Sequence, residues 1–198
     1  MGKRRTGELQ ARAKPEADAG MILKFLRKSP HAAAVERLHG EIVAAARQPA
    51  LFQEGYGVAD TLDGRFDLLV LHAFLALSAL AARPAPGPRI AQETADRLFA
   101  GLDAALREMG VGDLAVPKRM KKLGDDYNGR SAAYAAALAG QGGALEAALA
   151  RNIHGTADAS VAARLARYVR ATAAAMAAAD LAAFTQGPAP FQDAAAIA

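Results

Sequence analysis

Long apolar stretches rich in alanine alternate along this chain with short breaks at glycine and proline. The alternation of polar and apolar residues that is typical of strands is absent, and alanine has the highest helix propensity of all residues. The pattern therefore predicts an all-α protein, a single-domain bundle of about six helices around a central apolar helix. We expect these helices at residues 30–48, 63–82, 89–109, 113–139, 144–152 and 159–185.

The most hydrophobic segment, residues 68–82, is apolar on almost every side. Its 15 residues are fewer than the roughly 20 that an α-helix needs to cross a bilayer. It also contains His72 and Ser78, which a membrane span would have to bury in lipid. We therefore interpret the segment as the buried central helix of the bundle, with His72 as a core residue rather than a ligand or a base.

A glycine-rich break at residues 110–117 ends one predicted helix and begins another, because proline is tolerated in a first helical turn. Four cations follow immediately: Lys118, Arg119, Lys121 and Lys122. Cations at the start of a helix oppose its macrodipole, so an anionic partner would explain them. The alternative is a solvated helix face on which Lys121 and Lys122 pair with Asp125 and Asp126, four residues further on.

Composition narrows the classes of function. A chain of 198 residues can bury a sizeable core, and a hydrophobic content of 53% excludes wholesale disorder. The net charge of +4 comes partly from residues 1–20, so the body is only weakly basic and unlike a general nucleic-acid binder. Because the chain contains no cysteine, it has no disulfide, thiolate metal site or cysteine nucleophile.

Three regions are expected along the chain. Residues 1–20 are polar and lack the apolar stretch of a secretory signal, so we interpret them as a flexible leader. Residues 21–187 would form the helical domain. Residues 188–198, which follow a glycine–proline pair, are expected to be a loose C-terminal tail.

Two carboxylate patterns could suggest a metal site. Glu36 and His39 have the Glu-x-x-His spacing of di-iron bundles, but such a site needs a second copy and the sequence holds none. Asp63 and Asp67 have the spacing of a magnesium–diphosphate motif, but a single copy at a helix start is better explained by capping and the helix dipole. We therefore expect a protein that is not an enzyme, with no catalytic residue, no metal and no cofactor.

Residues 56–69 mix aromatic, apolar, acidic and basic side chains without periodicity, which is typical of a recognition segment. The alternative is a helix start at which aspartate and arginine side chains hold the backbone in place. Under the first interpretation, the candidate partner-binding residues in this segment are Tyr56, Asp60, Asp63, Arg65, Phe66 and Asp67.

Two motifs carry a resemblance to a known family. Residues 56–72, YGVADTLDGRFDLLVLH, and residues 109–122, MGVGDLAVPKRMKK, resemble the two signatures of the ubiquinol–cytochrome c chaperone family. The resemblance covers about residues 33–184, and further residues follow the second motif in the style of that family: Tyr127, Gly129, Arg130 and Tyr134. It implies an all-helical protein that assists assembly of ubiquinol–cytochrome c reductase. Mitochondrial members of the family bind newly made cytochrome b and associate with the ribosome near its exit tunnel.

The resemblance therefore implies a non-enzymatic assembly factor whose client is cytochrome b or a similar apolar membrane polypeptide. Its recognition surface would combine residues 56–67 with residues 118–122 and Arg130. Since the chain has no clear organelle-targeting segment, we expect a bacterial, cytoplasmic protein. It could also associate peripherally with the inner membrane. The alternative function is a peripheral binder of anionic lipid headgroups or ribosomal RNA through the basic helix start.

Overall fold

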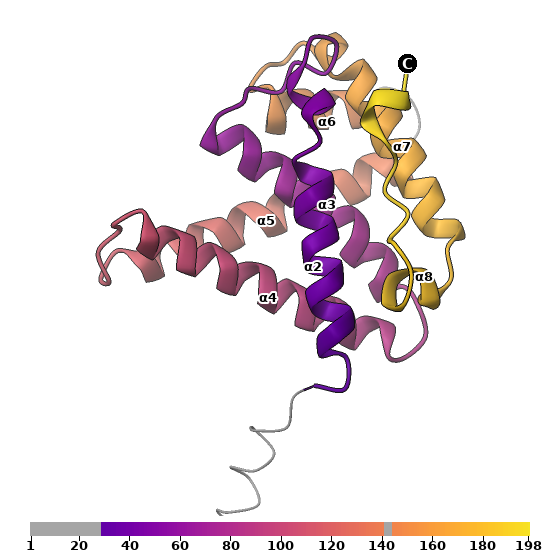
Figure 1. Ribbon diagram of the computed structural model, residues 1–198. Coiled ribbons are helices and arrows are strands. Elements are labelled where there is room, and N and C mark those ends of the chain that lie inside the picture. Colours follow the sequence, from indigo (N-terminus) through magenta and orange to yellow (C-terminus); the bar gives the residue numbers. More distant parts are fainter. Residues whose placement is uncertain (1–28, 141–143) are drawn as a thin grey trace, which may run out of the picture. The chain divides into compact units, whose positions relative to one another are not determined.

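A computed structural model describes residues 29–140 and 144–198, so the predicted leader lies outside the described residues (Figure 1). Within those ranges all regular structure is helical, which confirms the all-α prediction. Three short 3₁₀ helices occur at Pro49–Phe52 (η1), Ala159–Ala162 (η2) and Ala194–Ala196 (η3). The α-helices are α2 (Ala32–Ala46), α3 (Leu62–Ala81), α4 (Gly87–Glu108), α5 (Val116–Ala139), α6 (Ala144–Ile153), α7 (Ala163–Ala178) and α8 (Leu181–Thr185).

Residues 33–198 form one compact unit. Just before α2 begins, the His31 amide donates a hydrogen bond to Ser29 Oγ at 3.1 Å. The Ser29 hydroxyl therefore accepts a hydrogen bond from the turn before α2, and α2 begins and ends about two residues inside the predicted range, 30–48.

Helix α3 is the central helix of this unit, as predicted, and packs against α4, α5, α6 and α7. The argument from length was wrong, because α3 has 20 residues and is long and apolar enough to cross a membrane by length and composition alone. Packing against neighbouring helices decides that α3 lies in the core of the bundle. Twelve of its residues are buried, and they lie on all sides of the helix, so neighbouring helices cover the surface that lipid would otherwise have to cover.

The start of α3 differs slightly from the prediction because Thr61, rather than a later residue, caps the helix. Thr61 Oγ1 accepts a hydrogen bond from the amide of Gly64 at 3.1 Å. Gly64 is therefore helical rather than part of the preceding loop. A Cβ atom at this position would collide with the carbonyl oxygen of Ala59, so only glycine lets the loop approach the first turn this closely.

Helices α4 and α5 form an antiparallel pair joined by a short connection (Figure 1). As predicted, Gly110 terminates α4 in a left-handed conformation, with φ of +80°. Its amide donates to Arg107 O at 2.9 Å, and the amide of Val111 donates to Leu106 O at 3.0 Å, which is a Schellman motif. Pro117 lies in the first turn of α5, also as predicted.

The last predicted helix, 159–185, is divided into η2, α7 and α8. The chain leaves the helical conformation at Ala179, and Asp180 begins α8 by accepting a hydrogen bond from the amide of Ala183 at 3.0 Å. The prediction missed this break because an aspartate within an alanine-rich run was interpreted as a helical residue, whereas its side chain serves as an N-cap. The C-terminal carbonyls of α7 accept from Arg83, at Met176 O and Ala177 O.

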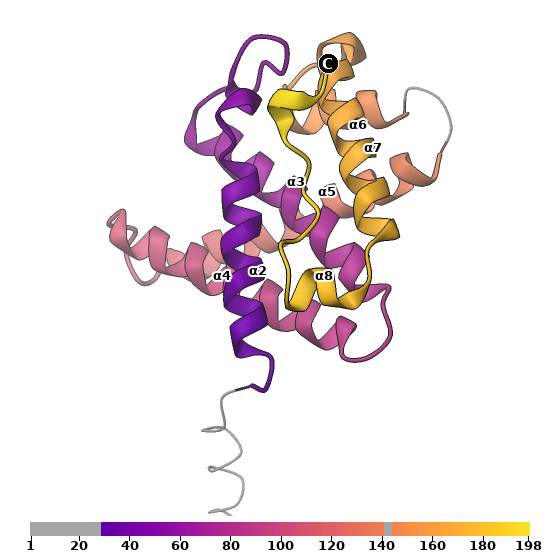
Figure 2. The same ribbon diagram turned by 45° about the vertical axis from the view of Figure 1, so that its right-hand side comes forward.

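The segment after α8 packs against the bundle, whereas the sequence predicted a loose tail at residues 188–198. Figure 2 shows this segment running between α2 and α7. Gln48 holds its backbone through two hydrogen bonds, to Gln192 O at 3.0 Å and from the amide of Ala194 at 2.7 Å. Ala194 is fully buried. The residues that order the tail are distant in sequence, so the tail itself carries no signal of its packing.

Candidate functional site

The structure divides the predicted recognition residues into buried and exposed groups. Tyr56 is 1% exposed, its hydroxyl donates to Ala194 O at 2.8 Å, and Arg164 lies 4.5 Å from the centre of its ring. The side chain is therefore part of the core and cannot contact a partner directly. This corrects the prediction of Tyr56 as a partner-binding residue.

Asp67 and Arg130 were both predicted as partner-binding residues, and the structure brings them together as an ion pair between α3 and α5. Asp67 is only 8% exposed, and burial raises the pKa of its carboxyl group more than the charge of Arg130 lowers it. The same guanidinium lies 5.7 Å from the centre of the half-buried Phe66 ring. These three residues therefore form a contact between α3 and α5. Asp67 is not a free carboxylate beside Asp63.

The other residues predicted in the first motif lie on the surface. Asp60 and Arg65 form an exposed ion pair at 2.6 Å, which lowers the pKa of Asp60 through the hydrogen bond from Arg65. Asp63 is exposed in the first turn of α3, where its charge is favourable to the helix dipole. These three side chains remain accessible to a partner.

The four cations at the start of α5 are all exposed. Lys121 pairs with Asp125 and Lys122 with Asp126, each at 2.7 Å, as the alternative interpretation predicted. Lys118 and Arg119 form no ion pair with any residue in the described ranges. Two of the four exposed cations, Lys121 and Lys122, are thus neutralised within α5, and the other two, Lys118 and Arg119, have no ion-pair partner in the described ranges.

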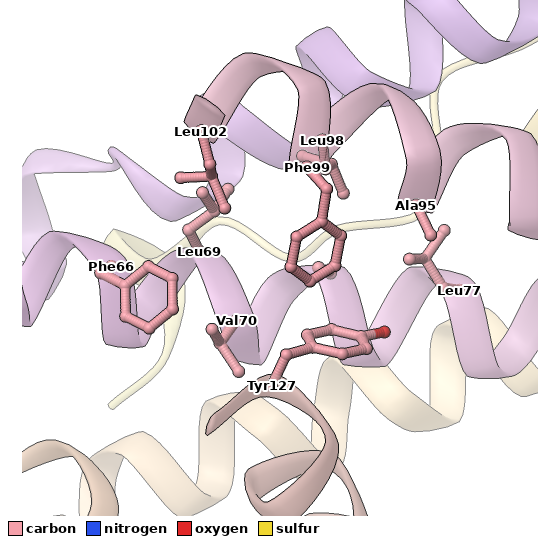
Figure 3. Close-up of a pocket in the computed structure, with 10 residues that line it drawn as sticks. Phe66, Leu69, Val70, Leu77, Ala95, Leu98, Phe99, Leu102 and Tyr127 are labelled. Carbon is pink, nitrogen blue, oxygen red and sulfur yellow. The ribbon is translucent and has the colours of Figure 1, made fainter. Parts of the chain in front are cut away.

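A half-open apolar hollow lies between α3, α4 and α5, next to Phe66 (Figure 3). Its free volume is about 20 Å³, and Phe99 and Tyr127 meet edge to face across it, with ring centres 5.8 Å apart. Several of its side chains are only half-buried. Its lining residues, none of them charged, are Phe66, Leu69, Val70, Ala73, Leu77, Ala95, Leu98, Phe99, Leu102 and Tyr127.

Sequence reasoning missed this hollow, which we call the α3–α4–α5 groove. A signal was present, because Ala95, Leu98, Phe99 and Leu102 follow the i, i+3, i+4, i+7 spacing of an apolar helix face. That spacing predicts a face buried in the core. It does not reveal that α3 and α5 leave part of this face uncovered, which only their arrangement in space decides.

His72 is a core residue with satisfied hydrogen bonds, as predicted. Its Nδ1 lies 2.7 Å from Leu68 O, so Nδ1 carries the hydrogen, and Nε2 accepts from the Tyr168 hydroxyl at 2.8 Å. Complete burial lowers the pKa of His72 to about 4, so the ring is neutral at pH 7. The imidazole therefore links α3 to α7 and has no nitrogen free for chemistry.

Glu36, which has the spacing of a metal ligand relative to His39, instead pairs with an arginine. Glu36 forms an ion pair with Arg97 of α4 at 2.7 Å, and this hydrogen bond lowers the pKa of Glu36. Within residues 29–140 and 144–198, no three His, Asp or Glu side chains come together as a set that could hold a metal ion.

The model of the ubiquinol–cytochrome C chaperone family matches residues 54–191, a range that contains the groove, the Asp67–Arg130 pair and the basic start of α5. The chain therefore belongs to the ubiquinol–cytochrome c chaperone family, as the two sequence motifs indicated. Its structure is similar to the crystal structure of the Cbp3 homolog from Brucella abortus, with a TM-score of 0.77 and 38% sequence identity, over 90% of this chain and 99% of that one. A comparison with curated proteins gives no match.

Proposed function

We propose that this protein is a non-enzymatic assembly factor for ubiquinol–cytochrome c reductase, and that it holds cytochrome b or a similar apolar membrane polypeptide before assembly. Membership of the chaperone family supports the role in assembly. The α3–α4–α5 groove is the observation that carries the choice of client, since a membrane polypeptide outside the bilayer exposes apolar side chains that need a temporary apolar partner.

The dimensions of the groove limit how a client can bind. A free volume of about 20 Å³ is close to the space of a single water molecule, so no side chain of a client enters it without a change. Phe99 and Tyr127 line the groove and are half-buried, so rotation of these two rings would enlarge it. The proposal therefore includes a client-induced opening between α4 and α5, with α3 as the stationary wall.

The polar residues of α3 support a binding role rather than a catalytic one. Asp67 is neutralised by Arg130, and both nitrogens of His72 are hydrogen-bonded. Neither group is free to act as an acid, a base or a nucleophile. The Asp67–Arg130 pair instead joins α3 to α5, two of the three helices that form the groove.

The test is affinity capture from native bacterial membranes with the whole chain and a variant of the groove. Leu102→Ser introduces a hydroxyl at a half-buried groove position, and Leu181→Ser makes the same change at a half-buried position of α8 outside the groove. Cytochrome b should be recovered with the unaltered protein and with Leu181→Ser, and should be strongly reduced with Leu102→Ser. Equal recovery with both variants would show that the client binds elsewhere, and absence of cytochrome b from all three would refute the proposed client.

The proposed location is the cytoplasm, with peripheral association with the inner membrane where the client is inserted. Cell fractionation tests it. The protein should divide between the soluble and membrane fractions and should leave the membranes on washing with salt or alkaline carbonate. Retention after a carbonate wash would contradict a peripheral association and would mean that α3 is inserted in lipid.

A further inference from the structure

The connection between α4 and α5 exposes apolar side chains that the groove does not use. We define the α4–α5 tip as residues 109–119. Leu114 is 98% exposed and Met109 is 53% exposed, and both lie in this short connection. Single exposed apolar residues are common on soluble proteins, but here two of them, Leu114 and Met109, share one short connection with two unpaired cations.

The charges around Leu114 are unequally compensated. Asp113 is engaged by Arg107 at 2.6 Å, and Asp125 and Asp126 are engaged by lysines further along α5. Within the ranges that the structure describes, Lys118 and Arg119 have no carboxylate partner. Residues 109–119 carry Lys118 and Arg119 against Asp113, a formal net charge of +1, and Arg107, which engages Asp113, is shared with Asp103.

The tip is held in shape by the protein itself. Val116 is 1% exposed and Leu106 is 8% exposed, so each end of the connection is anchored by a buried side chain. Gly110 closes α4 through the Schellman hydrogen bonds. Figures 1 and 2 both show the connection at the end of α4 and α5 that lies away from α7 and α8. Leu114 is thus presented by a defined turn, and ordering it at a surface costs little conformational entropy.

We propose that the α4–α5 tip docks on the surface of an anionic lipid membrane. Leu114 and Met109 enter the boundary between headgroups and acyl chains, while Lys118 and Arg119 contact lipid phosphates. An RNA partner would use the same two cations, but it offers no apolar phase to an aliphatic side chain. The exposed leucine therefore favours lipid over RNA. The proposal does not depend on which client the groove binds.

Binding of the purified whole chain to vesicles tests the proposal. The vesicles contain phosphatidylcholine alone or phosphatidylcholine with phosphatidylglycerol, and binding is measured by co-sedimentation at low and high salt. One variant carries Lys118→Gln and Arg119→Gln. Its matched control carries Arg47→Gln and Arg151→Gln, which remove two exposed arginines without an ion pair in the described ranges. A third variant is Leu114→Ser. Its control is Leu62→Ser, which makes the same change at a leucine that is 67% exposed.

The unaltered protein should bind the phosphatidylglycerol vesicles and be released by salt. Loss of each cation should weaken binding about 5-fold, so the tip variant should bind roughly 25 times more weakly than its control. Leu114→Ser should weaken binding roughly 10-fold or more, because it removes the apolar contact. All of these positions are exposed, so the melting temperatures should be similar. Equal binding by tip and control variants would overturn the proposal. Salt-sensitive binding to RNA that Leu114→Ser leaves unchanged, without binding to vesicles, would assign the tip to RNA instead.

Discussion

Arg130 of α5 forms an ion pair with Asp67 of α3, and the same guanidinium lies over the ring of Phe66, which lines the α3–α4–α5 groove. The two residues are 63 positions apart in sequence. Asp67 belongs to the first family motif, and Arg130 follows the second. The pair therefore explains in structural terms why the two segments belong together: one supplies the buried carboxylate, and the other supplies the charge that neutralises it.

Removal of Arg130 should destabilise the protein substantially. In Arg130→Met, Asp67 remains largely buried without its counter-charge. Breaking a buried ion pair costs about 3–5 kcal/mol, and the partial exposure of this one should reduce the loss to roughly 2 kcal/mol. The pKa of Asp67, already raised by burial, should rise further. Urea unfolding at pH 7 measures the loss.

Arg65→Met is the matched control, because it breaks the exposed pair with Asp60 on the same helix and should change the stability little. Adding Asp67→Asn to Arg130→Met removes the uncompensated charge and should restore part of the lost stability. If Arg130→Met and Arg65→Met lowered the free energy of unfolding equally, the Asp67–Arg130 pair would contribute no more than an exposed surface pair.

His72 makes the stability depend on pH in a defined direction. Its folded-state pKa is about 4, below the ordinary 6.5, so the unfolded chain binds a proton more readily than the folded one between these values. The contribution of His72 to the free energy of unfolding is therefore fully present above pH 6.5. It is lost as the pH falls towards 4, which lowers the free energy of unfolding by up to roughly 3 kcal/mol. Urea unfolding at a series of pH values should show this fall.

The variant His72→Gln isolates that contribution, since glutamine does not titrate. Burial also lowers the pKa values of His39 and His154, and these residues add a fall of the same sign in both proteins. The difference in slope between the unaltered protein and the variant therefore belongs to His72. Identical slopes below pH 6.5 would contradict the neutral, buried imidazole.

Gln48 should hold the C-terminal segment in place. Gln48→Ala removes two hydrogen bonds to the backbone of that segment and leaves the buried amide of Ala194 without a partner, at a cost of about 1–3 kcal/mol. Limited proteolysis should then cut within residues 188–198 before other sites. Gln92→Ala, which loses only an exposed contact with Asp96, should leave both properties unchanged. Resistance of the Gln48 variant to proteolysis would indicate that other contacts suffice.

The basic start of α5 should contribute little to folding. Changing Lys118, Arg119, Lys121 and Lys122 together to Gln removes cations from the positive end of a helix dipole, and it also removes two exposed pairs. These effects oppose each other, so the melting temperature should stay unchanged or rise slightly. Thermal unfolding followed by circular dichroism checks this. A large decrease would mean that the cations stabilise the fold.

The sequence by itself determined the helical elements and the family. Alanine content, the spacing of apolar residues and the Gly110 and Pro117 signals are local properties, and local propensity and capping depend on neighbouring residues in the chain. The family motifs are also contiguous in sequence. For the same reason the break at Asp180 was in principle visible, since it is an N-cap of ordinary type.

Only the tertiary structure decided which of the predicted recognition residues are free and which are buried. Tyr56 and Gln48 meet a segment about 140 residues away, Asp67 meets Arg130, and the groove exists because three helices leave one apolar face partly covered. Helical periodicity states which residues share a face but not what lies opposite that face. Burial, pairing and the uncovered groove depend on contacts between distant segments, and those contacts arise only when the helices pack together.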